Sequence, residues 1–157
     1  MYQASGDEQI IPIEPPLPEA DADVPMPRVA ANGHEAGIAY WTAPYEQRRV
    51  AVVRFRPAYA VLFGSPNDEA LHGHPLYPAG LRHYTFAEVE NSPWIAALER
   101  QNRVHPLHDP TRFASRRHFI LPFHDETFEC ISDVVEATLP DAAGPAEALA
   151  ALPLWRD

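Results

Sequence analysis

The central part of the chain alternates between short apolar runs and turn-forming residues, a pattern that predicts β-strands. Residues 49–55 are rich in β-branched and aromatic side chains, and a second apolar run covers residues 59–63. Pro57 separates the two runs, and residues 64–68 are the types that favour a turn. We therefore expect the two runs to pair as a β-hairpin.

A second hairpin is predicted for residues 118–131, where two apolar runs flank a polar turn. Pro122 lies in the first run, which predicts that this arm is at an edge of the sheet or at a bulge. A further strand is predicted for residues 81–90. Thr85 and Glu88 have the spacing of a helix capping box, however, so a short helix is the alternative for this segment.

One helix is clearly delimited by its sequence. Ser92 is a favourable N-cap and Pro93 suits the first helical position, so the helix is expected to begin there and to end near Arg103. Apolar residues at helical spacing form one face of it. Glu99 is spaced to form an ion pair with Arg103 on the other face. A shorter helix is predicted around residues 145–152.

Together these elements predict an α+β fold: a mainly antiparallel sheet built from two hairpins and a further strand, with one principal helix packed on it. Residues 1–37 differ from the rest, because the first 27 contain six prolines and six acidic residues and no basic residue. They predict an extended, solvated arm of polyproline type, whose apolar residues could alternatively pack along a groove. Residues 38–139 are expected to form a single α+β domain, and residues 140–157 a short helix and a tail.

The charge of the chain excludes several classes of partner. Of its 157 residues, 22 are acidic and 12 are basic, so the net charge is −10. Every basic residue is Arg, and no stripe of them is present, which argues against nucleic acid and against an anionic membrane surface. The acidic N-terminal segment lacks the features of a secretory signal, so we expect a cytoplasmic protein. An acidic surface favours a basic protein partner, and homo-oligomerisation stays open.

Histidines in the predicted loops are the main candidates for a ligand site, because loops on a rigid scaffold commonly carry function. The candidate pocket residues are His72, His74, His83, His105, His124 and Asp125. His72 and His74 could share a metal ion, and so could His105, His108 and Asp109. We favour a structural role for both groups, with Asp109 capping its own backbone in a polar turn, and expect no metal and no cofactor.

Other catalytic patterns are absent from the sequence. The chain has no glycine-rich phosphate loop, and the lack of Lys excludes Schiff-base chemistry. The single cysteine, Cys130, follows Phe128 in a predicted strand and is expected to be a small buried hydrophobic residue rather than a nucleophile.

These observations favour a small, acidic, non-catalytic protein-binding module, such as an accessory subunit or an immunity-type protein. The candidate partner-binding residues are Ile11, Ile13, Leu17 and Trp94. The alternative is a small enzyme or ligand-binding protein, metal-dependent or not, that uses the histidine-lined loop pocket. Three or more imidazoles converging within about 5 Å around a concavity would favour the alternative.

Overall fold

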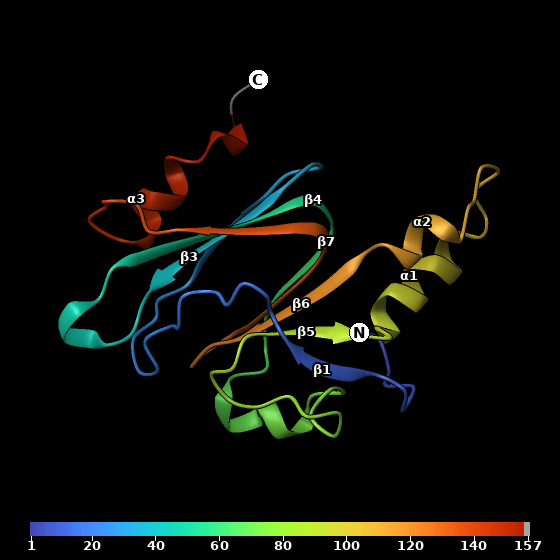
Figure 1. Ribbon diagram of the computed structural model, residues 1–157, viewed down its shortest axis with the longest axis horizontal. Helices are drawn as coiled ribbons and strands as arrows, with labels where there is room; N and C mark the ends of the chain where they lie inside the picture. Colours follow the sequence, from blue (N-terminus) through green and yellow to red (C-terminus); the bar gives the residue numbers. More distant parts are fainter. Residues whose placement is uncertain (156–157) are drawn as a thin grey trace.

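A computed structural model describes residues 1–155 and shows an α+β fold built on one seven-stranded antiparallel sheet (Figure 1). The α+β class and the antiparallel sheet predicted from the sequence are confirmed. The strands follow the order β1-β5-β6-β7-β4-β3-β2 across the sheet. They are β1 (Gln9–Pro12), β2 (Arg28–Ala31), β3 (Ala36–Trp41), β4 (Val50–Gly64), β5 (Ala87–Glu90), β6 (Arg117–Pro122) and β7 (Thr127–Thr138).

The described helices are short, and none of them is long and apolar enough to cross a membrane. They are α1 (Pro93–Asn102), α2 (Thr111–Ala114) and α3 (Pro145–Ala150), with 3-10 turns η1 (Tyr45–Gln47), η2 (Asp68–Gly73) and η3 (Pro153–Trp155). Helices α1 and α2 lie together at one end of the sheet, and α3 lies at the other end (Figure 1). The principal helix and the later short helix expected from the sequence therefore correspond to α1 and α3.

The hairpin predicted over residues 49–63 is wrong, because β4 is one continuous strand of 15 residues. It pairs with β7 over most of its length, and the register shifts between Ala58 and Ala60 as in a β-bulge. Strand β3 pairs with β4 only from Val50 to Phe55. Pro57 thus lies where β4 has a neighbouring strand on one side only, a position at which a residue without an N–H group is tolerated.

The second predicted hairpin is present as β6 and β7. Pro122 is the last residue of β6 and is paired with Thr127 at the turn, so its missing N–H group does not interrupt the ladder. The strand predicted for residues 81–90 is confined to β5, and the residues before Ala87 form turns instead.

Residues 1–37, expected to form an extended arm, contribute strands to both edges of the sheet. Strand β1 pairs with β5 at one edge and β2 pairs with β3 at the other. The segment between them, residues 13–27, must therefore cross a whole face of the sheet. Ile13 in this segment is only 3% exposed and forms part of the core between the segment and the sheet. Leu17 packs against the same core. Burial of these apolar side chains outweighs the proline-rich composition that predicted a solvated arm.

Both faces of the sheet are covered. On one face, Phe55 packs against Phe119 and Phe128 with ring centroids 5.5 and 5.2 Å apart, under the crossing N-terminal segment. The opposite face packs against α3 at one end. At its other end the opposite face packs against Trp94 of α1 and against leucines of residues 65–86. Polar side chains that point from β6 or β7 into this second layer are consequently shielded from solvent.

Candidate functional site

A cleft of about 1340 Å³ lies where β1 and β5 meet α1 and α2. Five carboxylates and two guanidinium groups line it, so its wall is negatively charged. The acidic residues are Asp7, Glu8, Glu88, Glu90 and Glu99, and the basic residues are Arg116 and Arg117.

Several of these charges are neutralised inside the protein. Arg117 forms an ion pair with Glu88 at 2.7 Å. Desolvation opposes ionisation of Glu8, but hydrogen bonds from the Ser5 hydroxyl and from nearby backbone N–H groups outweigh it and lower the pKa of Glu8. Asp7 and Glu90 are exposed, and their carboxylates have no hydrogen-bond or ion-pair partner within residues 1–155. These two carboxylates remain available to a ligand.

Arg116 is held at the cleft by two aromatic rings. Its guanidinium carbon lies 3.8 Å from the ring centroid of Tyr59 and 3.9 Å from that of Phe113. The Tyr59 hydroxyl in turn donates to Asp133 at 2.9 Å. Stacking of this kind fixes the guanidinium plane and leaves its charge in place at the wall of the cleft.

Ser92 lines the same cleft, between β5 and α1. Strand β5 ends at Glu90, Asn91 adopts a left-handed conformation with φ of 53°, and Ser92 is the N-cap of α1. The Ser92 Oγ accepts a hydrogen bond from the Ile95 N–H at 3.1 Å, as the sequence predicted for an N-cap. The same Oγ lies 2.8 Å from Nδ1 of His118 on β6.

A buried polar cluster continues behind His118 and centres on Glu129 of β7. His118 Nε2 lies 2.7 Å from Glu129 Oε2, and His74 Nε2 lies 3.1 Å from Oε1. The Tyr2 hydroxyl donates to Oε2 at 2.5 Å. Leu76 N donates to Nδ1 of His74, so the Nε2 of this ring carries the proton that faces the carboxylate.

The cluster keeps Glu129 ionised although it is almost completely buried. Desolvation disfavours the carboxylate, but the hydrogen bonds from His118, His74 and Tyr2 outweigh it and lower the pKa of Glu129 to about 2. Trp94 stacks on Tyr2 with centroids 5.8 Å apart and closes the cluster from the helix side. The result is a buried anion with several converging donors and an imidazole that connects it to Ser92.

A second polar cluster lies at the surface and centres on the half-buried Asp68. Nδ1 of His124 lies 2.8 Å from Asp68 Oδ2, to which the Tyr84 hydroxyl also donates. His83 Nε2 contacts the Asp68 carbonyl oxygen at 2.8 Å. The hydrogen bond that His124 donates to Asp68 raises the pKa of His124. The hydrogen bond that the Tyr84 hydroxyl donates to the same carboxylate raises the pKa of Tyr84 to about 12. This cluster ties the β6–β7 turn to η2.

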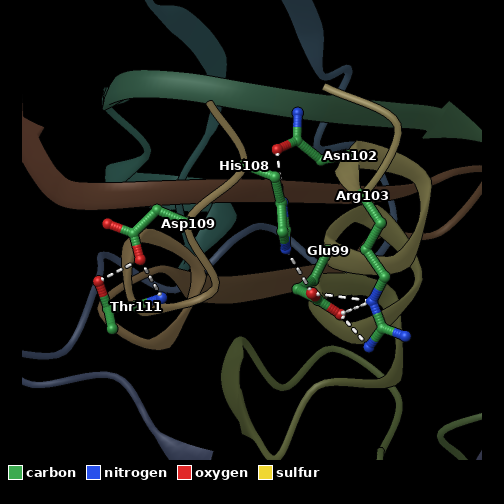
Figure 2. A network of polar contacts seen from close by, with 6 residues as sticks. All are labelled: Glu99, Asn102, Arg103, His108, Asp109 and Thr111. Carbon is green, nitrogen blue, oxygen red and sulfur yellow. Dashed lines mark hydrogen bonds and ion pairs between the residues drawn. The ribbon is translucent and has the colours of Figure 1, made fainter. Parts of the chain in front are cut away.

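A third network lies at the end of α1 and is shown in Figure 2. His108 lies between Asn102 and Glu99, with its Nδ1 2.9 Å from the amide oxygen and its Nε2 2.9 Å from the carboxylate. Asp109 accepts hydrogen bonds from the Thr111 N–H and hydroxyl at 2.9 and 2.7 Å. The polar turn predicted around Asp109 is confirmed, and Glu99 forms the predicted ion pair with Arg103 at 2.8 Å.

The histidines predicted to gather in one pocket are dispersed. His74 is buried beside Glu129, His83 and His124 meet at Asp68, and His72 and His105 are exposed elsewhere. Asp125 is exposed at the β6–β7 turn and does not hold His124, a role taken by Asp68. Within residues 1–155, no group of three or more His, Cys, Asp or Glu side chains is placed to hold a metal ion.

The candidate partner-binding residues are largely shielded. Ile13 and Trp94 are buried, and Ile11 and Leu17 are half-buried against the sheet. Any surface for a partner must therefore be sought elsewhere, and the cleft between β1, β5, α1 and α2 is one such concavity.

Sequence reasoning missed the side chains that connect the cleft to the buried cluster, namely Tyr2, His118 and Glu129, and assigned Ser92 only a capping role. The one signal was Glu129, an acidic residue between Phe128 and Cys130 in an otherwise apolar run. Comparison with known proteins adds no guide, since no family model, no curated protein and no solved structure matches the chain.

Proposed function

We propose that this protein is a protein-binding module that receives a positively charged segment of a partner in the acidic cleft. The observation that carries the proposal is the pair of exposed carboxylates, Asp7 and Glu90, which line a negatively charged cleft and have no partner within residues 1–155. Charges of this kind attract and orient an oppositely charged partner. The accessory or immunity-type role expected from the sequence is one form of such a module.

Apolar side chains next to the cleft support the proposal. The loop that joins α1 to Pro110 on the cleft wall exposes Val104 by 91% and Leu107 by 77%. This loop projects from the body of the molecule beside α1 and α2 (Figure 1). Apolar contacts supply much of the affinity of an interface, while charges supply orientation and rate of association.

The test compares partner retention by two variants with the same change in charge. D7N/E90Q removes the free carboxylates of the cleft, and D141N/E147Q removes two exposed acidic groups near α3. Each protein carries a C-terminal tag, because Tyr2 is buried, and is expressed in its own cells. Native mass spectrometry then measures the stoichiometry of the purified complexes.

We expect the wild type and D141N/E147Q to retain a stoichiometric basic protein, and D7N/E90Q to bind it at least about 10-fold more weakly, at roughly 1 kcal/mol per lost charge contact. The weakening should be reproduced in the wild type by raising the salt concentration. Equal retention by both variants, or a wild type that purifies without a stoichiometric protein, would contradict the proposal.

A further inference from the structure

We propose that Ser92 is a nucleophile for acyl transfer, activated through His118 and Glu129, and that the cleft admits an ester or amide substrate with a positively charged group. This activity goes beyond the binding role and would replace the non-catalytic character expected from the sequence. The charge preference of the substrate rests on the acidic cleft of the proposed function, whereas the nucleophile rests on separate contacts.

The first argument is the order of the contacting groups. A hydroxyl, an imidazole and a carboxylate follow one another, with 2.8 Å between Ser92 Oγ and His118 Nδ1 and 2.7 Å between His118 Nε2 and Glu129 Oε2. This is the connectivity of a nucleophile, a general base and a group that orients the base. The ring uses Nδ1 rather than Nε2 toward the serine, and either nitrogen can act as a base while the other carries the proton.

The second argument is the protonation pattern that the contacts impose. Ser92 Oγ already accepts a hydrogen bond from Ile95 N–H, so its own hydrogen can be donated to Nδ1 of His118. The proton of the ring then lies on Nε2 and faces Glu129. Tyr2 and His74 donate to the same carboxylate and act as positioning residues. The imidazole is thus held in the tautomer that accepts the serine proton.

The third argument is the position of Ser92 in the fold. It follows a strand and a left-handed residue, Asn91, and begins α1, so it lies at a strand-to-helix turn, without the flanking glycines of the hydrolase nucleophile elbow. The N-terminal end of a helix stabilises negative charge. The Ile95 N–H that caps Oγ therefore also favours the charge that develops on it. Ser92 is only 7% exposed and is one of the residues that line the cleft, and we therefore place the substrate in the cleft.

The proposed reaction conserves atoms and charge. Ser92 Oγ attacks the carbonyl carbon and its proton passes to His118 Nδ1, while Glu129 balances the imidazolium charge. Collapse of the tetrahedral intermediate breaks the bond to the alcohol or amine, which leaves with the proton from Nδ1. Water then attacks the acyl-serine and gives its proton to Nδ1. Collapse of the second tetrahedral intermediate breaks the bond to Ser92 Oγ, which takes the proton back from Nδ1, and a carboxylic acid is released.

The first experiment measures covalent labelling by a fluorophosphonate, followed by intact mass and peptide mapping. We expect one adduct on Ser92 in the wild type, none in S92A, and unchanged labelling in S65A, which alters an exposed serine far from the relay in sequence. Circular dichroism verifies that each variant is folded. A folded wild type that stays unlabelled at Ser92 overturns the proposal.

A second experiment separates activation from a capping role. The thiol introduced by S92C should react with iodoacetamide already near pH 6 if His118 activates it, and at least 10-fold more slowly in S92C/H118Q. The only native cysteine, Cys130, is buried and serves as the unreactive internal control. If H118Q does not fold, S92C is compared with N67C at the N-cap of η2, because a helix N-terminus alone also lowers the pKa of a thiol; only S92C should then react near pH 6.

Turnover is then measured with benzoyl-arginine ethyl ester and with its neutral citrulline analogue. We expect kcat/KM to be at least 10-fold higher for the arginine ester in the wild type and equal for the two esters in D7N/E90Q. Labelling of Ser92 without this preference would retain the nucleophile and overturn the cationic substrate. Partner binding through the cleft with no labelling would retain the proposed function and overturn the nucleophile.

Discussion

Replacing Glu129 by Gln tests whether the buried carboxylate holds the polar centre of the fold together. Gln has nearly the same shape but only one accepting oxygen, whereas Tyr2, His74 and His118 converge on both oxygens of the carboxylate. At least one donor loses its acceptor, and the charge that strengthens the remaining hydrogen bonds is removed. We expect E129Q to lower the free energy of unfolding by about 3–5 kcal/mol, the range for breaking a buried ionic group.

The pH dependence of the free energy of unfolding gives a second, independent value for the contribution of the ionised Glu129. The pKa of Glu129 lies at about 2 in the folded protein, below its ordinary value of 4.5. Glu129 in the unfolded chain takes up a proton near pH 4.5, but in the folded protein only near pH 2. Its contribution is therefore fully present above pH 4.5 and is lost as the pH falls toward 2. The difference corresponds to about 3 kcal/mol.

Urea unfolding at several pH values between 7 and 2, followed by tryptophan fluorescence, measures both effects. Trp94 stacks on Tyr2 and reports on the cluster directly. Between pH 5 and pH 2 the free energy of unfolding of the wild type should fall by about 3 kcal/mol more than that of E129Q. E69Q, at an exposed residue of η2, should follow the wild type. If E129Q keeps the wild-type pH dependence, the converging donors do not hold the charge and the reasoning is refuted.

Three further predictions concern other parts of the fold. D68N should lower the pKa of His124 toward 6.5 in an NMR titration, since the hydrogen bond that His124 donates to Asp68 raises it; an unchanged midpoint would contradict the pairing. Cys130, whose pKa burial raises to about 12, should react with a disulfide reagent only after unfolding, and reaction in the native protein would disprove its burial. G37A should lower the free energy of unfolding by about 1–3 kcal/mol, because its Cβ would lie 2.7 Å from a leucine methyl carbon; G33A has open space and should not, so equal costs would refute this explanation.

Elements governed by local rules could be predicted from the sequence. Ser92 and Pro93 mark the beginning of α1, and the polar turn between two apolar runs marks the β6–β7 hairpin. The effect of Pro57, by contrast, could not be predicted from its neighbours in the sequence. Whether it breaks a strand depends on how far β3 extends beside β4, which is set by pairing with a distant segment.

The buried cluster was hidden for a similar reason. In an alternating strand, Glu129 between Phe128 and Cys130 suggests a solvent-facing position. Here the face that carries Glu129 is covered by α1, by residues 65–86 and by Tyr2, and this covering follows only from the topology. The pairing of His124 with Asp68 likewise joins residues 56 positions apart, beyond the reach of spacing arguments.

The hydrogen bond between Tyr2 and Glu129 joins residues 127 positions apart, and this separation bears on how the chain acquires its structure. During synthesis Tyr2 leaves the ribosome long before its acceptor exists, and β1 must wait for β5 before it can pair. The long ladder between β4 and β7 is equally remote in sequence. Because distant contacts bring their stabilisation only after the entropy of loop closure has been overcome, we expect folding to be slow, in the range of about milliseconds to seconds, and to be completed only when nearly the whole chain has been made.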